Sequence, residues 1–149
     1  MRIVAQRVKE SKVMVDGQLS GAIGAGLLVF LGIHKEDSIS QIPWLVNKLV
    51  NLRVFQDERG KMNLSVKDIE GEILVVSQFT LYANCAGGRR PDFLDAAPPS
   101  LAVPLYEEFV SCVKREVGKV QTGIFGAEME VFLVNDGPVT LFLDDANCS

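Results

Sequence analysis

Two short, uninterrupted apolar runs constrain the fold of this chain most. GLLVFLGI spans residues 26–33, and ILVV spans residues 73–76 inside the longer stretch GEILVVSQFTLYA. Each run has the length of a strand and is far shorter than the roughly 18 apolar residues of a membrane-spanning helix. A strand that is apolar on both faces is buried on both faces, so the two runs predict central strands of a sheet.

Two further segments have the spacing of helices. Residues 38–52 carry an apolar stripe at helical period, and Pro43 is compatible with a helix only in its first turn. Residues 101–117 carry a second stripe, with Pro104 expected in the first turn and Gly118 ending the helix.

The two ends of the chain read as strands. Residues 1–23 predict two or three strands with a hairpin turn at Asp16-Gly17. Residues 119–144 predict strands again, with a strong turn signal at Asn135–Gly137. The order of elements favours the α+β class: a mixed or antiparallel β-sheet, or a sheet-barrel, with about two main helices. The length fits a single domain, residues 1–149.

Composition excludes several function classes. The formal net charge of −4 does not suit a protein that coats nucleic acid, so no DNA partner is expected. No signal peptide and no membrane span are evident, which points to the cytoplasm. Three widely spaced cysteines, Cys85, Cys112 and Cys148, match neither a disulfide framework nor a zinc pattern. Neither a metal nor a cofactor is predicted.

Polar residues end the second apolar run abruptly. Ser77, Gln78 and Thr80 follow the buried strand, where unsatisfied polar groups are costly. They form either a hydrogen-bond network at the strand end or a functional site. A serine or threonine nucleophile needs a base, and the only histidine, His34, lies far away in sequence. Backbone N–H groups at such a strand end can instead stabilise an oxyanion.

Three other motifs are ambiguous from the residues alone. Arg89 and Arg90 stand in a glycine-rich loop, where they either bind phosphate or remain solvated. Phe125 either stacks on a base or belongs to the core. Gly137-Pro138 is a candidate for a rigid backbone corner, since X-Pro bonds are where cis peptides occur.

Taken together, the motifs resemble those of the D-aminoacyl-tRNA deacylase family. SQFTL at residues 77–81, GRRP at residues 88–91 and NDGPVT at residues 135–140 carry the resemblance. MRIVAQRV, GLLVFLGI and NLRVFQDERGKMNLSV are also similar to it. The resemblance covers nearly the whole chain, in order.

The resemblance implies a reaction and an assembly. The family hydrolyses the ester between a D-amino acid, or glycine mischarged on tRNA-Ala, and the 3′-terminal adenosine of tRNA. It acts as a homodimer with the site at the subunit interface, and without a cofactor. Gly137-Pro138, a cis pair in this family, reaches into the other subunit's site, where its carbonyls hold the amino group and leave no room for an L side chain.

The resemblance also implies roles for other residues. Ser77, Gln78, Phe79 and Thr80 line the catalytic site, with backbone N–H groups near Gln78 and Phe79 stabilising the oxyanion and the tRNA 2′-hydroxyl assisting. Thr80 is the candidate catalytic side chain.

Four further residues are implied to bind the substrate. Phe125 and Met129 match positions near the terminal adenosine, and Arg89 and Arg90 match phosphate or acceptor-stem contacts. A related animal branch with a trans Gly-Pro pair acts on an L-alanyl-tRNA error. Its strand motif differs from Ser77-Gln78, so this chain resembles the D-specific branch.

Two alternatives remain open. One is a hydrolase of another ester, with Thr80 or Ser77 as the nucleophile. The other is a non-catalytic RNA-binding module.

Overall fold

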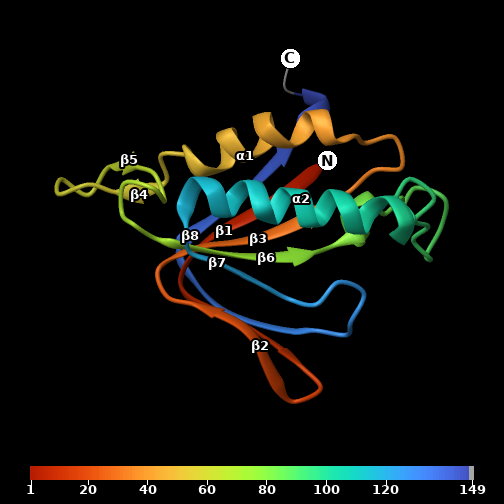
Figure 1. Cartoon of the computed structure of the whole chain (residues 1–149), viewed down its shortest axis with the longest axis horizontal. Coiled ribbons are helices and arrows are strands. Elements are labelled where there is room, and N and C mark those ends of the chain that lie inside the picture. Colours follow the sequence, from red (N-terminus) through yellow and green to blue (C-terminus); the bar gives the residue numbers. More distant parts are fainter. Residues whose placement is uncertain (148–149) are drawn as a thin grey trace.

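The computed structural model describes residues 1–147, which form a mixed sheet with two helices on one face (Figure 1). The strand order is β2-β1-β3-β6-β7, and β8 pairs with the long first strand β1. The strands are β1 (Arg2–Val15), β2 (Gln18–Ile23), β3 (Gly26–Gly32), β6 (Glu72–Ser77), β7 (Val120–Thr122), β8 (Glu130–Asp144), and a separate hairpin of β4 (Phe55–Gln56) and β5 (Met62–Leu64). The α-helices are α1 (Ile42–Val50) and α2 (Pro99–Val117), and the 3₁₀ turns are η1 (Ile39–Gln41), η2 (Phe79–Tyr82) and η3 (Asp145–Asn147). The prediction of an α+β fold is confirmed.

The two apolar runs are the central strands, as predicted. β3 and β6 lie parallel, with Leu31 opposite Ser77. Leu27 and Val29 pack in the core beneath the helices, whereas Leu28 and Leu74 pack in a second core on the other face. Because both faces are covered, every position of these strands except their ends is apolar.

The sheet curls until its two ends meet. Asp16 and Gly17, with φ of 50° and 76°, form the tight turn that sends β2 back along β1. At the closing edge the Ser20 hydroxyl donates to the Thr122 carbonyl at 3.0 Å. Gly21 permits this approach, since a Cβ there would lie 2.8 Å from the same carbonyl oxygen.

The turn expected at Asn135–Gly137 does not reverse the chain, and that prediction is wrong. β8 is one strand that pairs with β1 before and after this segment, and residues 136–139 bulge out opposite Arg7. Asn135 closes the bulge: its Oδ1 accepts the Val139 N–H at 2.9 Å and its Nδ2 donates to the Val139 carbonyl at 3.3 Å. The side chain therefore supplies the bonds that a hairpin would have supplied. The strand also begins at Glu130, later than expected, since residues 123–129 are irregular.

Both helices are present with altered starts. The first begins as the 3₁₀ turn η1 after Ser38, whose N–H donates to the Gln41 side chain at 2.7 Å, and Pro43 lies in the first turn of α1. The second begins at Pro99 rather than at residue 101, because a proline is well suited to the first helical position. Pro104 therefore lies inside α2 and not in its first turn, and it is tolerated on the exposed side. Within residues 1–147 neither helix has the length and apolar character needed to cross a membrane.

Candidate active site

The candidate site begins where β6 ends. After Ser77 the chain leaves the sheet at Gln78, with φ −144° and ψ 79°, and forms the turn η2. The Gln78 N–H donates to the Leu31 carbonyl at 2.8 Å. The N–H groups of Phe79 and Thr80 are the first of the turn, so they have no acceptor within it. Both residues are exposed, and within residues 1–147 neither N–H donates to a backbone carbonyl outside the turn.

An apolar cavity of about 420 Å³ lies beside this turn. It is lined by Ser77, Gln78 and Phe79, by Phe125-Gly126, and by residues of the loop 83–98 and the start of α2. A cavity of this size and character is typical of small-molecule sites. The structure thus brings the strand-end motif and Phe125 together, although more than 40 residues separate them in sequence.

Aromatic rings form much of the wall. Phe79 meets Phe93 edge to face at 5.0 Å between ring centroids, and Phe125 meets Tyr106 at 5.7 Å. The Tyr106 hydroxyl donates to the Val75 carbonyl at 3.0 Å, and burial raises the pKa of Tyr106 to about 12. The phenol therefore stays neutral and acts as a fixed donor beneath the cavity.

The hydroxyl groups of the motif have no base beside them. The Gln78 side chain donates to Thr80 Oγ1. His34 is occupied elsewhere: its Nδ1 accepts the Glu36 N–H at 3.1 Å and its ring lies 5.1 Å from Tyr82. Among residues 1–147 no hydrogen bond joins Ser77 or Thr80 to a histidine, a lysine or a carboxylate. This arrangement gives little support to a side-chain nucleophile.

Six of the ten predicted site residues lie outside the cavity wall: Thr80, Arg89, Arg90, Met129, Gly137 and Pro138. Met129 packs against Gly123 in the second core, and a Cβ on Gly123 would lie 2.5 Å from its sulfur. Arg89 and Arg90 are exposed in the loop 83–98. The same loop borders the cavity through Phe93, Ala96 and Ala97, whereas neither arginine lines it.

Gly137 and Pro138 form an exposed corner in the bulge of β8. Their peptide bond is cis, and Gly137 has a φ of 142°. Arg7, almost fully buried, holds the corner from behind: its Nε donates to the Asp136 carbonyl at 2.7 Å and its Nη1 to the Val54 carbonyl at 2.5 Å. The corner is therefore anchored to the segment that leads into β4.

A single chain keeps this corner away from the cavity. Ser77 is level with Leu31 in the sheet, whereas Arg7, behind the corner, is level with Leu27. That difference corresponds to about 13 Å along the strands. The corner also lies on β8, which β1 and β3 separate from β6.

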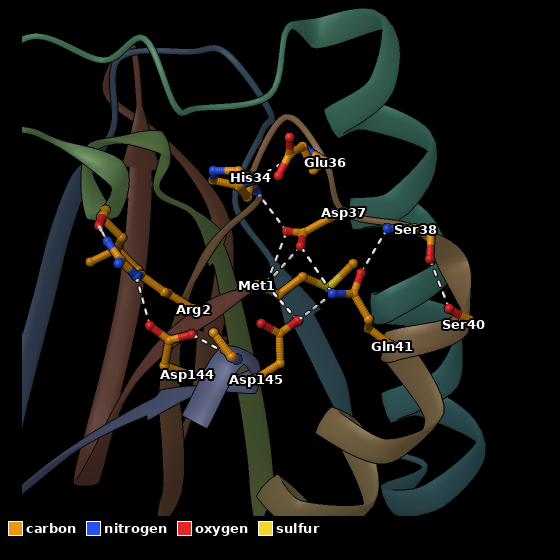
Figure 2. Close-up of polar contacts among 12 residues, drawn as sticks. Met1, Arg2, His34, Glu36, Asp37, Ser38, Ser40, Gln41, Asp144 and Asp145 are labelled. Atoms are coloured by element: carbon orange, nitrogen blue, oxygen red, sulfur yellow. Dashed lines mark hydrogen bonds and ion pairs between the residues drawn. The ribbon is translucent and has the colours of Figure 1, made fainter. Parts of the chain in front are cut away.

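A second, polar cavity of about 500 Å³ meets η2 at its other end, at Tyr82. Figure 2 shows its network: the Met1 α-ammonium contacts Asp37 at 3.0 Å and Asp145 at 2.6 Å, and Arg2 contacts Asp144 at 3.0 Å. Sequence reasoning missed this cluster and also Arg7. For Arg7 a signal existed, since it continues the inward alternation of Ile3 and Ala5 and is the only charged member.

The last features to consider are the possible metal ligands and the cysteines of residues 1–147. No three histidine, cysteine, aspartate or glutamate side chains within residues 1–147 are grouped so that they could hold a metal ion. Cys85 and Cys112 are free thiols, and Cys148 lies outside the described residues.

The fold and the cavity define a class: α+β proteins with a small-molecule cavity at the end of a central parallel strand. The family model described as D-Tyr-tRNA(Tyr) deacylase matches residues 4–144, and the chain belongs to this family. It is 59% identical over 144 residues to a D-aminoacyl-tRNA deacylase of Aquifex aeolicus, covering 97% of each chain. It is 57% identical over 144 residues to the protein of that name in Protochlamydia amoebophila, covering 97% of this chain and 95% of that one.

Solved structures agree with the fold. A structure titled c-Myc DNA unwinding element binding protein has a TM-score of 0.92 at 43% identity, covering 97% of this chain and 98% of the other. A second, titled as a probable eukaryotic D-amino acid tRNA deacylase, has a TM-score of 0.83 at 17% identity, covering 95% of this chain and 97% of that one. The second likeness concerns the fold alone.

Proposed function

We propose that this chain hydrolyses the ester that joins a D-amino acid to the 3′-terminal adenosine of tRNA. The observation that carries the proposal is the family match over residues 4–144. The apolar cavity beside η2 supports it, because it offers aromatic walls to a base next to free backbone donors. A tRNA substrate would place the activity in the cytoplasm.

The test is a paired turnover assay. D-tyrosyl-tRNA and L-tyrosyl-tRNA are incubated separately with the protein, and the released amino acid is followed. Release from the D-ester alone is expected. Release from neither ester by a folded protein would contradict the proposal and favour a binding module.

The proposed chemistry uses the backbone of η2. Water attacks the ester carbonyl carbon, and the developing oxyanion accepts hydrogen bonds from the N–H groups of Phe79 and Thr80. The Gln78 N–H is already donated to Leu31, so Gln78 acts instead through its side chain, which fixes Thr80. The bond between the carbonyl carbon and the 3′-oxygen then breaks. The neighbouring 2′-hydroxyl of the tRNA assists the transfer of a proton from the attacking water to the leaving 3′-oxygen. No base from the protein is required by this scheme.

The alternative with a side-chain nucleophile predicts a different result for Thr80→Ala. If Thr80 contributes mainly its N–H, removal of the hydroxyl lowers kcat by no more than about 10-fold, because the oxyanion donor remains. A nucleophile would lose on the order of 10³-fold or more. Single-turnover rates with D-tyrosyl-tRNA separate the two, and Ser77→Ala applies the same test to the other candidate nucleophile.

We propose that the site is completed by a second copy of the chain. Gly137-Pro138 of the partner subunit would reach the ester's amino group, hold it with carbonyl oxygens and leave no room for an L side chain. The separation of corner and cavity within one chain supports this arrangement. So do the exposed apolar side chains along β8: Phe132, Leu133, Val134 and Phe142. Glycine carries no side chain, so glycyl-tRNA mischarged on tRNA-Ala would also be accepted.

Mixing two inactive variants tests the shared site. Gly137→Ala damages the corner, and Ala97→Trp fills the cavity that Ala97 lines. Each variant alone should keep no more than about one hundredth of the wild-type activity. After co-refolding, about half of the dimers are mixed and each has one intact site, so about one quarter of wild-type activity should return. A mixture as inactive as its components would contradict a site shared between chains.

The remaining substrate contacts are proposed at the cavity mouth. Phe125 would stack on the terminal adenine, the backbone around Met129 would lie near the same adenosine, and Arg89 and Arg90 would meet phosphates of the acceptor end. Replacing both arginines by alanine should raise KM for charged tRNA and flatten its salt dependence, with kcat little changed. Steady-state kinetics at several ionic strengths measure this effect, and an unaltered salt slope would remove the phosphate role.

A further inference from the structure

We propose that Arg2 is a positioning residue for the deacylase site, because it fixes the turn whose first N–H groups receive the oxyanion. This inference rests on the proposed function of η2. Arg2 does not line the apolar cavity and instead lines the polar cavity, which meets the turn at its last residue, Tyr82. Its action is therefore indirect.

Arg2 binds the turn near its end. Its Nη1 donates to the Leu81 carbonyl at 2.9 Å, and its guanidinium carbon lies 4.4 Å from the centre of the Tyr82 ring. Arg2 thus contacts the third and fourth residues of η2 (Phe79–Tyr82). The first two residues of the same turn carry the proposed oxyanion donors. The hydrogen bond to the Leu81 carbonyl and the stacking on the Tyr82 ring together restrict both the position and the rotation of the turn.

The guanidinium is itself anchored. Arg2 Nε donates to Asp144 Oδ2 at 3.0 Å, as Figure 2 shows, and Arg2 and Asp144 are direct partners in the β1–β8 ladder. The other oxygen of Asp144 accepts the Ala146 N–H at 3.0 Å. The Asp144 carboxylate is therefore held in place by the sheet and by η3, and its hydrogen bond holds the Arg2 guanidinium in place in turn.

The sheet also holds the turn through β3, whose Gly32 is the direct partner of Arg2 in the β1–β3 ladder. The Gln78 N–H is donated to Leu31, and Leu81 lies so close to Gly32 that a Cβ there would be 2.9 Å from the Leu81 Cβ. Gly32 thus lets the turn rest on β3, and Arg2, next to it in the sheet, binds the same residue of the turn, Leu81. A 3₁₀ turn this short has weak internal hydrogen bonds, so its geometry depends on such external contacts.

The experiment compares Arg2→Met and Arg2→Lys with the wild type on two substrates. One is D-tyrosyl-tRNA, and the other is the D-tyrosyl ester of adenosine, which has no phosphate. Methionine keeps the unbranched stem and loses every donor, whereas lysine keeps one charged donor without the planar fork. Arg115→Met removes an exposed arginine that pairs with Glu108 on α2 and is the matched control.

Arg2→Met should lower kcat by about 50-fold on both substrates with KM unchanged, in line with the roughly 10²-fold loss that a displacement of about 1 Å causes. Arg2→Lys should lower kcat by about 5-fold, since one ammonium group cannot hold Leu81 and Asp144 in the fork geometry. The control should match the wild type.

Other outcomes overturn the proposal. A rise in KM for the tRNA only, with the adenosine ester unaffected, would make Arg2 a phosphate contact. Wild-type kcat in Arg2→Met would remove any role. If Arg2→Met does not fold, Arg2→Lys decides alone, and wild-type kcat there contradicts the need for the fork. An inactive wild type would instead contradict the proposed function.

Discussion

Gly137→Ala is expected to lower turnover of D-aminoacyl-tRNA by about 100-fold, as a displaced contact of about 1 Å does. A Cβ at this position would lie 2.8 Å from Arg7 Nη2 and 3.1 Å from the Val139 nitrogen. The φ of 142° is also one that an L side chain rarely adopts, at a cost of about 1–3 kcal/mol. Both effects push the corner out of place. Turnover of separate D- and L-tyrosyl esters measures the result.

Gly118→Ala is the matched control for that variant. Gly118 has a φ of 79° at the end of α2, and a Cβ there meets no atom within 4 Å. It should lose some thermal stability through the same kind of backbone strain while its kcat stays at the wild-type value. If Gly137→Ala keeps both full activity and full preference for the D-ester, the proposed role of the corner in selection is wrong.

Arg7→Met is expected to have the largest effect on stability, lowering the free energy of unfolding by about 2–4 kcal/mol. The change leaves the carbonyls of Val54 and Asp136 without the donors that now lie 2.5 and 2.7 Å away. Because the same guanidinium supports the Gly137 corner, activity toward the D-ester should fall as well. Urea unfolding and the paired ester assay follow the two effects.

Arg115→Met tests whether that loss is specific to a buried arginine. Its pair with Glu108 is exposed, so the free energy of unfolding should not differ measurably from that of the wild type. A similarly small change for Arg7→Met would mean that water replaces the guanidinium and that the corner does not depend on it.

Parts of the fold were predictable because their residue pattern is compatible with only one local structure. The runs at residues 26–33 and 73–76 are apolar on both faces, and only burial on both faces accommodates them. Asp16-Gly17 predicted its turn because the left-handed conformation needs such residues. The segment at Asn135–Gly137 has the same chemistry but gave a bulge, since pairing with β1 on both sides outweighed the local preference.

The candidate site was predictable only in its local part. Ser77 to Thr80 stand out because polar residues follow a buried strand. That Phe125 lies beside them depends on β7 pairing with β6, which no short motif encodes. The contacts through which Arg2 supports η2 and Arg7 supports the Gly137 corner could not be predicted for the same reason. Their partners Leu81, Asp144 and Asp136 are distant from the arginines in sequence.

The curled sheet also bears on how many copies of the chain would assemble. Ser20 and Thr122 close one side of the sheet, so the outer side of β8 is the one long strand edge that the described residues leave without a β partner. A molecule with one such edge can pair with a second copy through the same surface on both subunits. After this pairing neither subunit has a second edge of this kind to bind a third copy. Growth would stop at two subunits by geometry, and the apolar side chains that favour pairing would be covered in the finished pair, where they could not seed a fibre.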